Sequence, residues 1–178
     1  MRAAQRFATD APDGVRLLQI GKTGRDGLDP LLAATNAFYL TIHGLGAAAT
    51  FRDWVILGDL PGGPRQLAYD WAPYAERFVL VVEPTWQSML TARRIQRVAT
   101  SARPEIEVSL VVNKTTGEHD AARVGAFLEM PVLAVVPLDE DVRAAELHGI
   151  ALLDLAPNGA AVCAIEQLTD RLQERTLG

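Results

Sequence analysis

The chain has 178 residues, of which 49% are hydrophobic, and a formal net charge of −5. A chain of this length can bury the core of one domain, so we expect a single domain over residues 1–178. No block of Lys and Arg interrupts the acidic balance, which argues against a nucleic-acid binder. The single cysteine, Cys163, excludes an intrachain disulfide.

The N-terminal residues, MRAAQRFATDAPDG, lack the apolar core of a signal peptide. No apolar run approaches the roughly 20 residues that a membrane-spanning helix needs. These features predict a cytoplasmic protein with neither a membrane nor a nucleic acid as its partner.

The first elements in chain order are a short strand over Val15–Ile20 and a helix from Asp29 to Leu45, with Pro30 in its first turn. Between them, the segment Gly21–Gly24 (GKTG) resembles the end of a phosphate-binding loop. The pattern GxxxxGK[ST] requires an earlier glycine, and Arg16 stands in its place. We therefore interpret this segment as an ordinary loop.

The segment Gly44–Ala49 (GLGAAA) matches the GxGxxA fingerprint of dinucleotide-binding proteins. That fingerprint needs a full helix after it, and the next predicted strand already begins around Trp54. Too few residues remain for the helix. The end of the preceding helix at Gly44 or Gly46 is the interpretation we favour.

The central segment of the sequence is Asp53–Gly63 (DWVILGDLPGG), which predicts a buried strand that ends at Asp59 and runs into a tight loop. A continuous apolar run is typical of parallel sheets, in which ligands bind beyond the carboxyl ends of the strands. Glycines after the acid let the backbone approach a ligand and present N–H groups to an anion. The alternative is that Asp59 caps a turn, because Pro-Gly-Gly is favourable turn chemistry in itself.

Strands of about five residues alternate with helices from Trp54 onward. The strands are expected at 78–82, 108–112 and 132–136, with a last extended piece at 150–155, and the helices at 65–72, 86–102, 121–130, 142–148 and from Pro157 or Asn158 to the end. This alternation predicts an α/β fold with a mainly parallel, doubly wound sheet and helices on both faces.

Each predicted strand ends in polar residues, namely Asp59, Glu83, Asn113 with Lys114, and Asp139 with Asp141. The carboxyl ends of parallel strands meet at one edge of a sheet, so we expect these side chains to converge on one rim. For any one of them, a helix cap or a turn residue is the alternative interpretation.

Four segments in series, DWVILGDLPGG, FVLVVEPTWQSMLTARRI, VSLVVNK and VLAVVPLDEDVRAAELHG, resemble the ParA/MinD family of P-loop ATPases in the SIMIBI class. Within that family they are most similar to the CooC-like ATPases of nickel insertion. The likeness covers roughly residues 50–178. It implies a P-loop NTPase-like fold with ATP and Mg²⁺ as cofactors, and a homodimer as a possible assembly.

The resemblance also implies roles for residues in the central segment. Asp59, Pro61 and Gly63 match the D-x-P-x-G switch II segment of the family. There the acid holds a water molecule on Mg²⁺ and the glycine amide senses the γ-phosphate. Asp59 is accordingly our candidate catalytic residue.

The later segments carry the implied base-binding residues. Asn113, with Lys114 beside it, resembles the asparagine that binds adenine, and Pro137 with Asp139 resembles the segment that closes the base pocket. An asparagine side chain offers a base edge both a donor and an acceptor.

The sequence departs from the family in three ways. It has no glycine-rich phosphate loop with two lysines, no counterpart to the switch I aspartate, and no Cys-x-Cys pair for metal binding. Three hypotheses follow: an ATPase domain missing its first strand, Walker A loop and first helix; a pseudo-ATPase that keeps the fold for protein contacts; or another α/β binding module such as a receiver. We expect a nucleotide-binding, ATPase-type protein, accessory to metalloenzyme maturation or acting as a partner-regulating switch.

Overall fold

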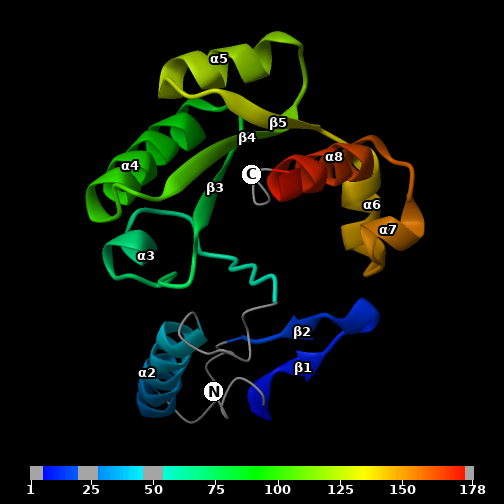
Figure 1. Cartoon of the computed structure of the whole chain (residues 1–178). Helices are drawn as coiled ribbons and strands as arrows, with labels where there is room; N and C mark the ends of the chain where they lie inside the picture. The colour runs from blue at the N-terminus through cyan, green and yellow to red at the C-terminus, as the bar shows by residue number, and fades with distance from the viewer. Residues whose placement is uncertain (1–5, 20–27, 46–53, 175–178) are drawn as a thin grey trace. The chain divides into compact units, whose positions relative to one another are not determined.

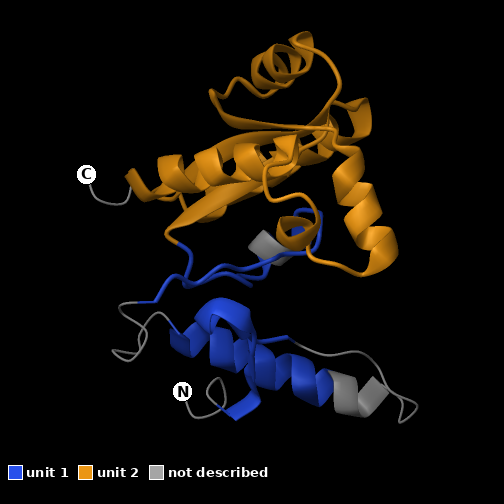
Figure 2. Cartoon of the chain, turned by 90° about the vertical axis from the view of Figure 1, so that its right-hand side faces the viewer, with its two compact units in different colours: residues 1–75 blue, residues 76–178 orange. Residues whose placement is uncertain are grey.

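The computed structural model describes residues 6–19, 28–45 and 54–174 (Figure 1). The chain divides into two compact units, residues 1–75 and 76–178, and each is described by itself (Figure 2). The expected single domain stays a prediction. The GKTG segment and residues 46–49 of the GLGAAA segment lie outside the described residues.

The described residues of unit 1 include a short hairpin and the helices α2 and α3. Strands β1 (Thr9–Asp10) and β2 (Arg16–Leu17) pair antiparallel across the 3-10 turn η1 (Pro12–Gly14). β2 confirms part of the strand expected at 15–20. The helices are α2 (Leu28–Leu45), close to the predicted 29–45, and α3 (Arg65–Ala68), which is shorter than the predicted 65–72.

An aromatic cluster packs α2 against the end of unit 1. The ring of Trp71 lies 5.3 Å from that of Tyr39 and 6.4 Å from that of Phe38, measured between centroids. Ile42 on the same helix and Ala72 beside the tryptophan are both buried. Aromatic pairs at these distances add to the burial of apolar area, so they hold α2 in place.

The strand expected at the start of the central segment is not formed. Residues 54–60 have no strand assignment, and Val55 and Leu57 are 96% and 93% exposed. A strand is stable only when its N–H and C=O groups pair with a neighbouring strand. The apolar run has β-forming composition, but among the described residues it pairs with no strand, so the predicted buried strand is wrong.

Unit 2 is a three-stranded parallel sheet with crossover helices. The strands β3 (Arg77–Val82), β4 (Glu107–Thr115) and β5 (Val132–Pro137) lie in the order β3-β4-β5. Helix α4 (Trp86–Ala102) connects the first pair and α5 (His119–Leu128) the second. This confirms the α/β class and the parallel sheet, and three predicted elements, β3, α4 and β5, agree with the structure to within one residue.

Two apolar clusters cover the two faces of this sheet. On one face, Leu80, Leu110 and Val112 pack against α4 and α5, with Met89 and Val124 as their most buried partners. On the other face, buried side chains of β4, β5 and α8 (Ala160–Glu174) meet; they are Val111, Ala134, Val136 and Ala161. Because successive strand residues point to opposite faces, the same short strands serve both clusters.

The segment after β5 corrects one expectation. Helix α6 (Glu140–His148) ends at Gly149, whose φ of 64° is the left-handed conformation typical of a helix C-cap. Residues 150–155 were expected to be extended, yet Leu152–Leu155 form the short helix α7, in which Ala156 N–H donates to Leu152 C=O over 2.8 Å. Within the described residues no further strand pairs with β5, so a helical turn satisfies these backbone groups instead.

Candidate functional site at the carboxyl edge

The register of the sheet brings three predicted site residues to one edge. Asn113 lies opposite Val136, and Thr115 lies opposite Pro137. Leu138 N–H then donates to Thr115 C=O over 2.9 Å. Asn113, Lys114 and Pro137 therefore share the carboxyl edge of neighbouring strands, where ligands of open α/β sheets bind.

Lys114 occupies an irregular position in β4. Its φ is 56°, the register shifts between Asn113 and Thr115, and the strand runs three residues past its expected end at Val112. The Nζ atom lies 2.6 Å from Oε1 of Glu83, which follows β3. This hydrogen bond and the charge of Glu83 raise the pKa of Lys114. The two strand ends thus converge as expected, although the ion pair was not foreseen.

Asn113 is half-buried at this edge. Its Oδ1 accepts a hydrogen bond of 2.9 Å from Lys114 N–H. The oxygen keeps a second lone pair, and the amide NH₂ of Asn113 donates to none of the described residues. The side chain thus still presents one acceptor and one donor, the combination that pairs with an adenine edge.

Asp139 is the N-cap of α6 and also binds α8. Oδ1 accepts from Asp141 N–H and Oδ2 from Ala161 N–H, each over 2.9 Å. The bond from Ala161 and then that from Asp141 lower the pKa of this carboxyl group. Asp139 therefore joins the starts of two helices beside the carboxyl edge, and its expected place in a base pocket stays a prediction.

A second acid that binds backbone amides, Asp120 in the first turn of α5, was not predicted from the sequence. Oδ2 of Asp120 accepts from Thr116 N–H over 2.9 Å and from Gly117 N–H over 3.2 Å, which lowers the pKa of Asp120. These bonds order the loop that follows Lys114. An acid placed three residues after a glycine at the start of a helix was the available signal, because Asp side chains readily bond nearby backbone amides.

The switch II candidates belong to unit 1. Asp59 and Pro61 are exposed, and Gly63 has a φ of 118°, a conformation that side chains rarely adopt. The tight turn after Asp59 is thus confirmed together with its need for glycine. Because the two units are described separately, the expected grouping of Asp59 with Asn113 stays a prediction.

The Mg²⁺ implied by the resemblance can be tested against the donors present. In the described part of the chain no three His, Cys, Asp or Glu side chains gather as a metal site. Mg²⁺ in nucleotide sites is commonly held by one or two carboxylates together with phosphates and waters. The exposed carboxylate of Asp59 fits that requirement.

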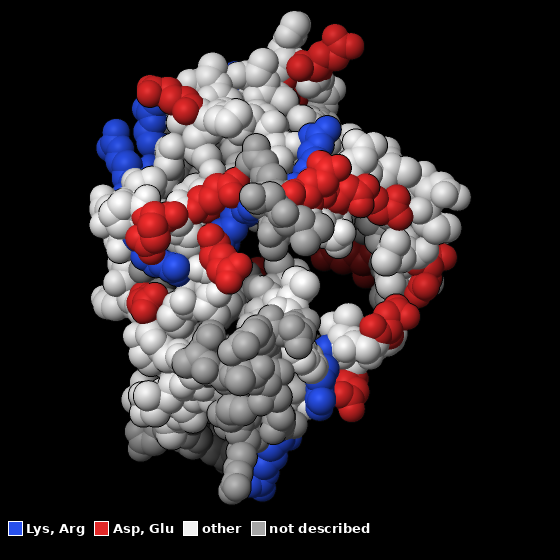
Figure 3. Space-filling view, in the orientation of Figure 1, with Lys and Arg blue, Asp and Glu red and all other residues white. Residues whose placement is uncertain are grey.

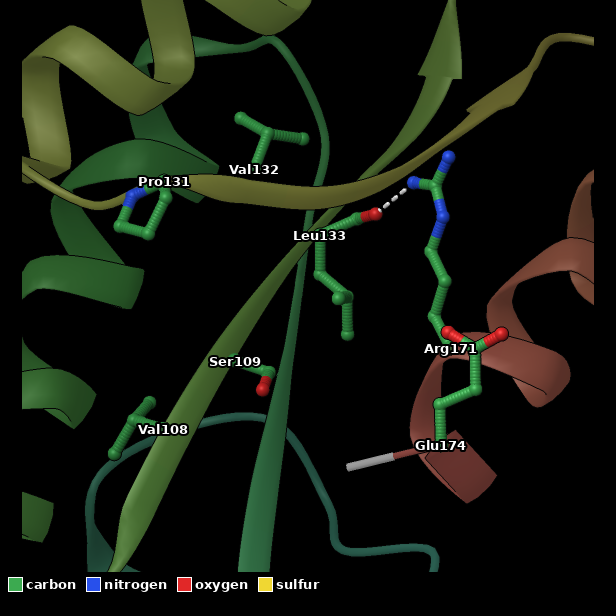
Figure 4. A pocket seen from close by; sticks show the side chains of 7 residues that line it. All are labelled: Val108, Ser109, Pro131, Val132, Leu133, Arg171 and Glu174. Atoms are coloured by element: carbon green, nitrogen blue, oxygen red, sulfur yellow. Dashed lines mark hydrogen bonds between the residues drawn. The ribbon is translucent and has the colours of Figure 1, made fainter. Parts of the chain in front are cut away.

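The sheet also has a cavity of about 310 Å³ at its opposite, amino edge (Figure 4). It is lined by the first residues of β4 and β5 and by Arg171 and Glu174 of α8. Arg171 donates to Leu133 C=O, so its guanidinium already has a partner. This cavity shares no residue with the carboxyl edge, and none of the predicted site residues lines it. No helix within residues 6–19, 28–45 and 54–174 combines the length and the apolar character that spanning a bilayer requires.

Comparison with known proteins finds relatives that are ATP-binding proteins. Two proteins of Methanocaldococcus jannaschii, both uncharacterized ATP-binding proteins, are 28% identical to this chain over 121 and 101 residues. The matches cover 66% and 55% of this chain but 46% and 39% of the relatives, so the chain spans less than half of their length. No model of a protein family matches.

Two solved structures share the fold of this chain. The septum site-determining protein MinD of Pyrococcus horikoshii, in complex with Mg-ADP, superposes with a TM-score of 0.73 at 18% identity, over 97% of this chain and 70% of that chain. The cell division ATPase MinD of Pyrococcus furiosus gives a TM-score of 0.61 at 22% identity, over 74% and 58%. The chain therefore has the fold of the MinD ATPases, which confirms at the level of the fold its resemblance to the ParA/MinD family of P-loop ATPases.

Proposed function

We propose that this chain binds an adenine nucleotide at the carboxyl edge of the β3-β4-β5 sheet, as part of an ATPase-type protein of the ParA/MinD kind. The observation that carries the proposal is the position of Asn113 on β4, level with the last residues of β5 and with its amide NH₂ unpaired among the described residues. The MinD structure with Mg-ADP and the ATP-binding relatives from Methanocaldococcus support it.

The chemistry of the edge suits a purine base. Asn113 offers an acceptor and a donor to the N6 amine and a ring nitrogen of adenine. Leu138, which follows Pro137 and is 54% exposed, offers an apolar surface for the ring. Asp139, the residue after Leu138, is held to the starts of α6 and α8 by its two backbone bonds. Guanine presents two acceptors on the corresponding edge, so the same side chain pairs with it less well.

The phosphates and Mg²⁺ have support from the resemblance alone. Asp59 would hold a water molecule of the ion, and the Gly63 amide would face the γ-phosphate. The sequence given has no phosphate loop, so base contacts supply most of the affinity we expect. The proposal also includes a cytoplasmic location, a homodimer, and a role in metalloenzyme maturation like that of CooC-like proteins.

Calorimetric titration with ADP and with GDP tests the proposal. We expect ADP to bind more tightly than GDP, and Asn113→Ala to abolish that preference. Asn36→Ala makes the same chemical change on the exposed side of α2 and should leave both titrations unaltered. Equal affinity of the wild type for the two nucleotides would contradict the base-binding role. Binding of neither would favour the pseudo-ATPase hypothesis.

A further inference from the structure

Helix α4 presents an outer face with an unusual composition for so acidic a chain. It carries Arg93, Arg94 and Arg97 and no acidic residue. At 100° per residue, Trp86, Leu90, Arg94 and Arg97 share one side of the helix, turned away from the buried Ala92 and Ala99. Trp86 is 63% exposed and Leu90 39%. We call these four residues the basic face.

The arginines of this face differ in their contacts. Arg93 stacks on the ring of Phe127 at 4.1 Å and donates to its carbonyl oxygen, so it is used within the unit. Arg94 and Arg97 are exposed and form no ion pair with the described residues. Two cations are thus available on a solvent-facing strip that also offers apolar area.

Helices α6 and α7, which contact each other, have the complementary composition. Four acids and one arginine, Arg143, give this pair a net charge of −3, against +2 for Arg94 and Arg97 of the basic face. The acids are Glu140, Asp141, Glu146 and Asp154. Leu147 and Leu153 are 75% and 63% exposed. We call the surface of α6 and α7 the acidic face.

The two faces lie on opposite sides of the sheet. α4 packs on the side formed by Leu80, Leu110 and Val112, whereas Leu152 of α7 packs against the cluster around Val111 on the other side. Figure 3 shows acidic side chains on the right-hand side, over α6 and α7, whereas on the left-hand side, over α4, Lys and Arg stand beside acidic side chains. A single copy cannot bring these faces together.

We propose that the basic face of one copy docks on the acidic face of a second copy. Both faces combine exposed apolar side chains with charge of opposite sign, so the contact buries apolar area while its charges pair. A two-fold dimer would need the two faces side by side, and they are on opposite sides, so the contact is head-to-tail. The α4 surface is only about 25 Å long, which places the contact among small, weak interfaces.

Analytical ultracentrifugation over a concentration series, without nucleotide, tests the contact independently of the carboxyl-edge site. The wild type should gain mass as its concentration rises, and less so in high salt, because exposed charge pairs are screened. Association through unpaired apolar surface would persist or strengthen in salt. Each of Arg94→Glu/Arg97→Glu and Glu146→Arg/Asp154→Arg should weaken self-association about a hundredfold, since like charges would then face each other.

Mixing these two variants gives the decisive result. The first keeps an intact acidic face and the second an intact basic face, and the two reversed faces are also of opposite charge, so an equimolar mixture should regain the self-association that each variant lacks alone. Arg65→Glu is the matched control, because it reverses an exposed arginine of α3 that belongs to neither face. If circular dichroism shows a folding defect, Arg94→Gln/Arg97→Gln replaces the first variant. A wild type that stays monomeric at all concentrations, or folded variants that fail to pair when mixed, would overturn the proposal.

Discussion

At Gly125, helix propensity and core packing have opposite effects on the free energy of unfolding. It is a buried residue inside α5, where replacement of Gly by Ala normally stabilises a helix by about 1 kcal/mol. A Cβ at this position would lie 3.1 Å from the carbonyl oxygen of Met130 and 3.1 Å from Cγ2 of Val132. Both contacts are tighter than ordinary van der Waals packing, and overpacking in a core costs about 1–3 kcal/mol.

The backbone contact decides the sign. Met130 N–H donates to Gly125 C=O over 3.1 Å, and Glu129 between them has a φ of 56°, so this turn is closed and cannot easily move away. We therefore expect Gly125→Ala to destabilise unit 2 by about 1 kcal/mol, the midpoint of the overpacking cost less the helix gain. A simple propensity argument predicts the opposite sign.

Urea denaturation followed by circular dichroism measures the change, with hydrogen exchange of β4 amides as a readout specific to unit 2. Ala122→Gly, at an exposed position of the same helix, calibrates the propensity and should cost about 1 kcal/mol. In a Val132→Ala background the penalty of Gly125→Ala should shrink, because one of its two close contacts is removed. Stabilisation by Gly125→Ala in the wild-type background would refute the packing of α5 described above.

Three further predictions follow from the same structure. Leu110→Ala, at a fully buried position of the central strand, should lower the free energy of unfolding by about 2–5 kcal/mol, and a loss below about 1 in urea denaturation would contradict its place in the core. The pKa of Asp139 is lowered below its ordinary value of 3.8, so this group stabilises the folded state at pH values above 3.8, and that stabilisation is lost as the pH falls further. Asp139→Asn should therefore lose less stability in acid than the wild type does in pH titrations of unfolding, and parallel curves for the two proteins would argue against the hydrogen bonds from Asp141 and Ala161. The chain as given should hydrolyse ATP negligibly in a phosphate-release assay, because it lacks the phosphate-loop lysine and amides that contribute several kcal/mol to transition-state stabilisation. Turnover that Asp59→Ala abolishes would contradict this.

The fold of unit 2 could be predicted from the sequence because its signals are local. The uninterrupted apolar run of β3 and the spacing of Met89, Ala92 and Ile95 in α4 each identify one element without knowledge of the rest. Thr85 accepts from Ser88 N–H as the N-cap of α4, so the start of the helix is also encoded beside it. Parallel pairing then followed from the length of the crossover helices.

The expectations that failed depended on neighbours that local patterns do not reveal. The run Trp54–Leu57 has β-forming composition, yet its pairing depends on a strand elsewhere in the chain. The segment 150–155 alternates little and is short, so either an extended or a helical conformation is compatible with it. The helical turn forms where no further strand of the described residues pairs with β5.

The candidate site shows the same division. The carboxyl-edge location of Asn113 and Pro137 follows from strand direction, which the sequence encodes. The ion pair of Lys114 with Glu83 joins residues 31 positions apart, and the bond of Asp139 to Ala161 joins residues 22 apart. Pairings of this kind require the three-dimensional structure, because no local pattern specifies them.

The central claim is that an adenine nucleotide binds at the carboxyl edge of the sheet. Hydrogen exchange with and without saturating ADP tests it most directly, with GDP at the same concentration as the control. We predict added protection in peptides covering residues 113–117 and 137–141, and none in those lining the amino-edge cavity at 131–133 and 171–174. Protection confined to the amino-edge peptides, or equal protection by GDP, would contradict the claim.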